Sequence, residues 1–332
     1  MNTGDLSTLL VWAAATTFTI ALIAYSVDLA RIADRAQRAA EPALVGAGSG
    51  RPASAVAGSE AQRAPGRSAR AEGIARSTHL LGLVMLFVAI GLRGLAAGRW
   101  PTANMYEFTL VGVFVAVLVL AIVQRRRIIA FVAVVVMGMS VLALVTALNW
   151  FFIQADAVQP ALQSYWLVLH VGVAISATGI FTVAFAASVL QVLKSYREEG
   201  LVASVPARRS DGLRRTVGGR RFAWLEQVPG SRELEAMAFR LNSVAFVLWT
   251  FTLIGGAVWA EHAWGRYWGW DPKEVGTFVA WVVYAAYLHA RTTRGWSGRR
   301  ASYFVFVGYA VVLMNFTVIN LVVTGKHSYS GL

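Results

Sequence analysis

Long apolar stretches separated by short polar segments dominate this chain. Each stretch is bounded by charged or turn-forming residues and approaches the roughly 20 residues that a helix needs to cross a bilayer. The predicted spans cover residues 7–27, 79–98, 107–124, 128–149, 163–193, 240–260, 275–291 and 302–323. The pattern therefore predicts an all-α fold, a polytopic membrane helix bundle with about eight transmembrane helices.

The basic residues predict the orientation of these spans. If both termini lie outside, 25 of the 30 Lys and Arg residues fall in or beside the inner loops, as the positive-inside rule requires. The outer side then holds only Arg93, Arg99, Arg266, Lys273 and Lys326. We therefore predict that the N- and C-termini lie outside.

Composition excludes a soluble domain and argues against nucleic acid as a partner. The chain is 57% apolar and 14% charged, with a net charge of +13. Its basic residues lie beside membrane helices, where topology and anionic lipid explain them. The expected partners thus include the lipid bilayer and no nucleic acid.

Two polar stretches predict mobile segments. Residues 40–72 are rich in Ala, Gly, Ser, Pro and Arg, a composition typical of disordered linkers. The basic run at 208–221 has the same character. We therefore divide the chain into residues 1–78, a first transmembrane helix plus a disordered cytoplasmic linker, and residues 79–332, one membrane domain. Because Asp5 is the only charge ahead of the first span, we expect that span to be retained and not cleaved as a signal peptide.

Histidine is the candidate metal ligand, because the chain contains no cysteine and so has no thiolate of its own. The five histidines are His79, His170, His262, His289 and His327. His170 and His327 fall near the outer ends of predicted spans. His289 lies deeper, roughly 20 Å from the outer edge of its span at 1.5 Å per residue.

An aromatic run lies between these two outer histidines in the chain. Residues 259–276 read WAEHAWGRYWGWDPKEVG. Two outer histidines and this run indicate a flat ligand such as haem, whose iron takes axial imidazoles and whose ring stacks on aromatic side chains. The pattern fits interfacial histidines and a membrane belt of tryptophans about equally well. The crowding of the aromatic residues in one predicted loop favours haem, because a belt is spread over many helix ends.

Several motifs along the chain resemble one family. WGRYWGWDPKE at 264–274 is similar to the WWD signature of haem-handling proteins of cytochrome c maturation. The supporting motifs, in chain order, are PTANMYE at 101–107, YWLVLH at 165–170, YLHAR at 287–291 and GKHSY at 325–329. Residues 79–332 thus resemble the CcsA (ResC) family of system II cytochrome c biogenesis, whereas residues 1–78 match it less well.

The resemblance implies roles for the histidines. Residues His170 and His327 would flank the WWD loop and hold haem at the outer surface, and His289 would ligate haem within the membrane. All three would be axial ligands of the haem iron, with the second ligand for His289 supplied by a partner subunit. His79 and His262 match none of these roles.

Residues of the WWD stretch would contact the porphyrin. Trp264, Trp268 and Trp270 would form an aromatic platform, and Asp271 would shape the loop and the start of the next helix. Arg266 and Lys273 are candidate partners of the haem propionates. Contacts with lipid phosphate or solvent explain these two charges equally well.

The resemblance also implies a function. Haem b would be the bound substrate, delivered across the membrane and positioned for thioether attachment to the CXXCH motif of apocytochrome c on the outer face. The chain would be a subunit of a holocytochrome c synthase of the cytochrome c haem-lyase type. Its partners would be a CcsB (ResB)-like membrane subunit, apocytochrome c and thiol-reducing proteins of the outer face. Its location would be the bacterial cell membrane, or the thylakoid membrane in plastids.

Other functions remain open at this point. A haem exporter built as a secondary transporter predicts inverted repeats and broken paired helices, and the sequence shows neither. A System I-type haem-handling protein would share the WWD stretch, but this chain has the length of neither the small nor the large protein of that system. A structural scaffold would not need histidines at three depths. Near the third span, Asn104 and Glu107 are expected to cap the helix.

Overall fold

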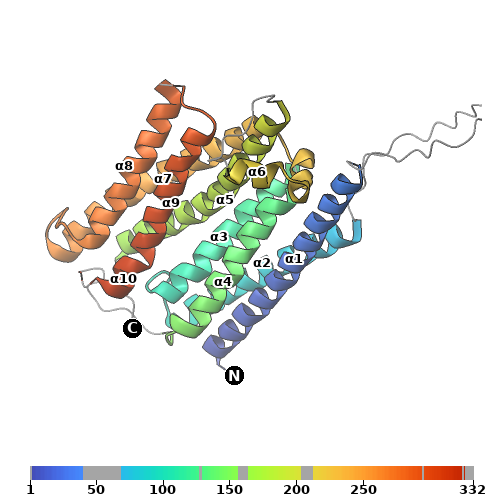
Figure 1. The fold of residues 1–332 in the computed structure, drawn as a ribbon. Coiled ribbons are helices and arrows are strands. Elements are labelled where there is room, and N and C mark those ends of the chain that lie inside the picture. The colour runs from blue at the N-terminus through green and yellow to red at the C-terminus, as the bar shows by residue number, and fades with distance from the viewer. Residues whose placement is uncertain are drawn as a thin grey trace, which may run out of the picture.

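The computed structural model describes residues 2–39, 69–126, 129–155, 164–202, 212–293, 295–323 and 325. These residues form helices, and none of them lies in a β-strand. In chain order (Figure 1) the helices are α1 Thr3–Ala39, α2 Ala69–Ala97, α3 Met105–Arg126, α4 Ala130–Trp150, α5 Tyr165–Val202, α6 Gly212–Gly218, the 3₁₀ helix η2 Arg220–Gln227, α7 Ser231–Trp264, α8 Pro272–Thr293, α9 Arg299–Phe316 and α10 Val318–Val322.

The helices confirm a multi-pass membrane protein. Within the described residues, 7 segments are long and apolar enough to cross a bilayer, namely α1 to α5, α7, and α9 continued by α10. Helix α8 has 22 residues but carries Lys273, Glu274 and Arg291, and it is not among the 7. The predicted count of about eight spans therefore depends on α8.

The start of the first helix and the last described helix lie at the same end of the bundle. Figure 1 shows that the start of α1, the connection from α7 to α8, and α10 lie at the same end of the bundle. This agrees with termini on one side of the membrane. That this side faces outward stays a prediction from the charge distribution.

Both predicted mobile stretches overlap helices. Helix α2 begins at Ala69, within the predicted linker, and the rest of that linker, residues 40–68, lies outside the described residues. The prediction for the basic run was wrong over residues 212–221, which contribute to α6 and η2. Residues 208–211 lie outside the described residues.

Arg197 explains why the basic run folds. Its guanidinium, on α5, donates to the carbonyl oxygens of Val217, Gly218 and Gly219 at 3.2, 2.6 and 3.0 Å. These carbonyls lie at the end of α6, where helical donors are missing. Arg197 also pairs with Glu226 of η2 at 2.6 Å. One buried arginine thus anchors both short helices to α5.

Two apolar clusters fill the bundle. One lies mainly among α1, α2, α3 and α4, and the other among α5, α7, α8 and α9, with α5 contributing to both. Close approaches accompany this packing: a Cβ added at Gly82 would lie 2.5 Å from the ring of Phe18. The candidate functional site is bordered mainly by the second group of helices and by the start of α3.

Candidate functional site

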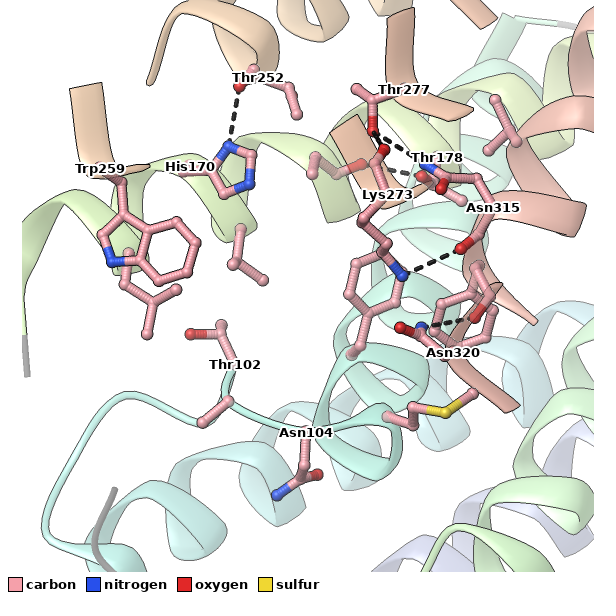
Figure 2. A pocket seen from close by; sticks show the side chains of 18 of the residues that line it. Thr102, Asn104, His170, Thr178, Thr252, Trp259, Lys273, Thr277, Asn315 and Asn320 are labelled. Carbon is pink, nitrogen blue, oxygen red and sulfur yellow. Dashed lines mark hydrogen bonds between the residues drawn. The ribbon is translucent and has the colours of Figure 1, made fainter. Parts of the chain in front are cut away.

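A pocket lies where α3, α5, α7, α8 and α9 approach one another (Figure 2). Its empty volume is about 920 Å³ when the solvent at its open mouth is included. A second hollow of about 390 Å³ shares His170, Thr252, Lys273 and Thr277 with it and extends to Trp268 of the α7–α8 loop. Together the two hollows connect the helix bundle with the aromatic loop.

His170 has a defined orientation in this pocket. Its Nδ1 lies 2.8 Å from the carbonyl oxygen of Thr252 in α7. A carbonyl can only accept a hydrogen bond, so Nδ1 carries a proton, and in the neutral imidazole Nε2 then carries the lone pair. Histidines that bind metals typically donate their other ring N–H in this way. The His170 ring also stacks on Trp259, with centroids 6.1 Å apart and planes 11° apart.

Gly256 provides the space for the His170 ring. A Cβ added at this position of α7 would lie 2.7 Å from Cε1 and 2.9 Å from Nδ1 of His170. At the neighbouring Gly255 the nearest atom would be 3.7 Å away, an ordinary contact. The sequence pattern did not predict a role for Gly256 or Thr252. The paired glycines in an apolar helix were the one available signal, because Thr252 acts through its backbone.

The aromatic run is divided between a helix and a loop. Trp259 and Trp264 belong to α7, which ends where Gly265 adopts a φ of 67° and donates to the carbonyl of Glu261 at 2.7 Å. The expectation of one loop holding all these aromatic side chains was therefore wrong. Trp259 is 1% exposed, and Trp264 packs edge-on against it with centroids 4.8 Å apart.

The loop itself presents Trp268 and Trp270. Their rings are nearly perpendicular, with centroids 5.7 Å apart. Trp270 has a φ of 57° and is the single non-glycine residue with positive φ in the described chain. Its side chain is 77% exposed. A bulky residue in this strained conformation is uncommon and often marks a functional site.

Asp271 joins this loop to α8. Its Oδ1 accepts the backbone N–H of Lys273 at 3.0 Å, and Glu274 Oε2 accepts the N–H of Asp271 at 3.1 Å. This reciprocal arrangement is a capping box, with Pro272 at the first helical position. Glu274 also accepts the N–H of Gly269 at 2.8 Å. The acidic pair thus fixes the loop on the helix start.

The two basic residues of the stretch are placed differently. Arg266 is exposed, and its guanidinium lies over Gly269, where a Cβ would be 2.7 Å from Nε. Lys273 lines both hollows, and its ammonium donates to the carbonyl oxygen of Asn315 at 3.0 Å. Figure 2 shows Lys273 in the same pocket as His170.

His327 lies outside the described residues. Gly325, two positions earlier, is described and lies against the capping carboxylate: an added Cβ would be 2.7 Å from Oδ2 of Asp271. Gly325 and Asp271 line a small hollow beside α8 and α10. The last described residue of the chain is therefore next to the aromatic loop.

The other histidines lie away from the pocket. His289 is exposed on α8, and His262 is exposed on α7 with its Nδ1 2.8 Å from the carbonyl of Val258 in the same helix. His79 is buried between α1, α2 and α3, with Nδ1 3.3 Å from the hydroxyl of Tyr25 and Nε2 3.1 Å from the carbonyl of Val117. Of the predicted residues, the pockets bring together His170, Trp268 and Lys273.

An ion cluster holds the segment that closes the pocket near α3. The buried Glu107 pairs with Arg93 at 3.0 Å and with Arg99 at 2.7 Å. Its backbone N–H donates to Oδ1 of Asn104 at 2.9 Å, which confirms the expected helix cap. Residues 102–105 line the pocket, so this cluster positions one of its walls.

Comparisons with known proteins agree with this arrangement. The profile of the family "Cytochrome C assembly protein" matches residues 102–327. A "Cytochrome c biogenesis protein CcsA" of Synechococcus sp. (strain CC9902) is 34% identical over 264 residues, covering 77% of this chain and 86% of that protein. The protein of the same name from Parasynechococcus marenigrum (strain WH8102) is 35% identical, covering 75% and 86%.

A solved structure shares the fold. "Cytochrome c Heme Lyase CcmF" superposes with a TM-score of 0.58 at 16% identity, covering 95% of this chain. The chain spans about half the length of that protein, 47%. At this identity the likeness concerns the fold alone. With 34% identity to CcsA over most of both chains and a matching family profile, this multi-pass membrane protein belongs to the cytochrome c assembly family, among proteins related to CcsA.

Proposed function

We propose that this chain binds haem b as a substrate and positions it for covalent attachment to apocytochrome c, as a subunit of a holocytochrome c synthase. The main support for the proposal is the orientation of the His170 ring. Its Nδ1 is bound to the Thr252 carbonyl, which leaves the lone pair on Nε2, in a pocket continuous with the aromatic loop. This is the orientation that an axial imidazole needs.

The lining of the pocket fits a porphyrin. A haem has large apolar faces and one polar edge. The pocket offers apolar and aromatic side chains together with a few polar groups, among them Lys273, Thr277 and Asn315. The name of the relatives, "Cytochrome c biogenesis protein CcsA", supports a role in the same process.

The second axial ligand at this site is His327. Support comes from Gly325, which lies against Asp271 at the end of the aromatic loop. Haem at the outer side would thus be held by His170 and His327, with Trp268 and Trp270 beside the ring. Trp264 is the last residue of α7 before the loop, and it packs against the buried Trp259, which holds the start of the loop in place.

His289 acts earlier, on haem within the membrane. Its side chain is exposed on α8 and does not line the pocket. An ionisable side chain on the outside of a membrane helix is costly unless it is paired. A CcsB (ResB)-like subunit packed on this face would cover His289 and supply the opposing ligand.

The attachment reaction needs positioning more than acid–base catalysis. Each thiol of the CXXCH motif adds across one vinyl group: a C–S bond forms, the vinyl double bond is consumed, and the thiol hydrogen ends on the terminal vinyl carbon. The addition has no leaving group and no net oxidation. Holding the two reactants in the right geometry is the contribution that this chain can make. Thiol-reducing proteins of the outer face would keep the two cysteines reduced.

The test is the absorption spectrum of the full-length chain, purified with any subunit that accompanies it. We expect the spectrum of a low-spin haem with two histidine ligands in the wild type. His170→Gly and His327→Gly should each lower the haem content, and added imidazole should partly restore it. Rescue by imidazole separates loss of a ligand from loss of the fold.

His262→Gly is the matched control, because His262 is an exposed histidine near the same loop whose Nδ1 contacts its own helix. This variant should retain its haem. Unchanged haem content in both His170→Gly and His327→Gly would contradict the proposed site. A wild-type protein that transports haem without retaining it would indicate an exporter instead.

A further inference from the structure

Lys273 places a basic amine inside the pocket, where burial lowers the pKa of the amine to about 7. It is the second residue of α8, and it lines both hollows beside His170. Its ammonium donates to the carbonyl oxygen of Asn315 at 3.0 Å. Within the described part of the chain this is its one hydrogen-bond partner, and no carboxylate oxygen lies within 4.0 Å of it. An ammonium has three N–H donors, so two remain available to a ligand or to water.

Helix capping explains only part of this arrangement. Asn315 lies in the last turn of α9, where carbonyl groups lack helical donors and a lysine is stabilising. That role uses one donor of the ammonium and does not require a position between two hollows. The Asp271 carboxylate attracts the amine electrostatically, but its Oδ1 accepts the backbone N–H of Lys273, and within the described residues the two side chains form no ion pair. A charge in such a site is stabilised by an anionic partner.

Arg266 does not share this position. It lines neither hollow, it is exposed, and its guanidinium lies over Gly269. Of the two basic residues that the sequence offers in this stretch, Lys273 alone faces the pocket that contains His170.

We infer that Lys273 binds a propionate carboxylate of haem and thereby sets the orientation of the ring. This inference rests on the proposed function. In protoporphyrin the two propionates occupy one edge and the two vinyl groups lie toward the opposite edge. A salt bridge at Lys273 holds the propionate edge in the pocket and directs the vinyl edge away from α8. Lys273 is thus a positioning residue that decides which edge of haem meets the thiols.

The test compares iron protoporphyrin IX with its dimethyl ester, which lacks the two carboxylates. Dissociation constants for both compounds are measured by titration of the full-length chain in detergent, for the wild type, Lys273→Met, Lys273→Gln, Lys273→Arg and Arg266→Met. We expect the wild type to bind the acid roughly tenfold or more tightly than the ester, since hydrogen bonds to charged groups have about this strength.

The ratio of the dissociation constant of the ester to that of the acid should approach one in Lys273→Met, because the acid binds more weakly to this variant. Binding of the ester should stay unchanged, which shows that the pocket is intact. Lys273→Gln, which keeps an N–H donor at this position, should lose the preference equally. Lys273→Arg should largely retain it because the charge is kept, and Arg266→Met should retain it.

If this ratio were near one in the wild type, or if it stayed high in Lys273→Met and Lys273→Gln, the inference would be wrong, although haem binding itself would remain intact. A ratio lost in Arg266→Met but kept in the Lys273 variants would transfer the role to Arg266. A wild type that binds neither compound would instead contradict the proposed function itself.

Discussion

The Nδ1 atom of His170 in α5 lies 2.8 Å from the carbonyl oxygen of Thr252 in α7. This contact crosses two long helices and fixes both the position of the imidazole and the ring nitrogen that carries its proton. It is possible because Gly256, one helical turn beyond Thr252, has no side chain where the ring lies. The orientation of His170 therefore depends on the packing of α5 against α7.

Gly256→Ala should displace the His170 ring. The added methyl would lie 2.7 Å from Cε1 of His170, and overpacking of this kind costs roughly 1–3 kcal/mol unless the side chain moves. We expect the haem-to-protein ratio of the purified protein to fall several-fold. Membrane abundance, measured on the same samples by immunoblot, should change much less.

Gly255→Ala is the control for this prediction. It adds the same methyl to the neighbouring position, where the nearest atom would be 3.7 Å away. Haem content should stay near the wild-type level. Equal losses of haem in the two variants would show that helix packing in general, and not the His170 ring, is responsible.

Asp271 should act through its capping geometry. Its Oδ1 accepts the N–H of Lys273, and an asparagine oxygen can do the same. Asp271→Asn should therefore retain haem and thermal stability, whereas Asp271→Ala should lose about 1 kcal/mol of stability and part of the haem. If Asp271→Asn behaved like the alanine variant in a thermal unfolding assay and a haem assay, the negative charge would be the essential feature.

The aromatic platform can be tested at Trp270. Because its φ is 57°, a left-handed conformation that costs a non-glycine residue about 1–2 kcal/mol, Trp270→Gly removes the ring while relieving the backbone. We expect the haem-to-protein ratio to fall with no loss of thermal stability. A membrane belt predicts the reverse, an unchanged ratio with lower abundance in the membrane.

A double substitution gives a second test of the aromatic platform. Trp268→Ala combined with Trp270→Ala should release haem at unchanged membrane abundance, whereas single Trp→Phe changes at either position should be mild. Each stacked aromatic pair contributes about 0.5–1.5 kcal/mol beyond burial. A double variant that retains its haem would remove the platform from the proposal.

His289→Ala should reduce haem at the outer site although that site is intact. The side chain is exposed on α8, away from the pocket, so its loss would interrupt supply and not retention. Haem content should fall in protein isolated from cells and recover when haem is added to the purified protein. The control Thr292→Ala changes another exposed residue of the same helix. Full haem content in isolated His289→Ala protein would assign His289 to another role.

The sequence by itself determined the membrane helices and the motifs of the site. A segment in the bilayer must satisfy all of its backbone groups internally, so every apolar stretch of sufficient length becomes a helix. Each predicted span lies largely within an observed helix. The role of Asp271 at the start of α8 also followed from local chemistry, since proline is favoured at the first position of a helix and an acidic residue before it can accept the free backbone N–H groups. Family motifs pointed to His170 in the same way, through residues close to it in the chain.

Only the tertiary structure decided which way these helices face. Lipid and protein interior are both apolar, so the periodicity that separates buried from exposed positions in a soluble helix is weak here. The burial of Trp259 behind His170, the exposure of His289 and the opposite placements of Arg266 and Lys273 depend on contacts between α5, α7, α8 and α9. The carbonyl of Thr252 and the space at Gly256 arise from the same contacts, because neither has meaning until the two helices pack together.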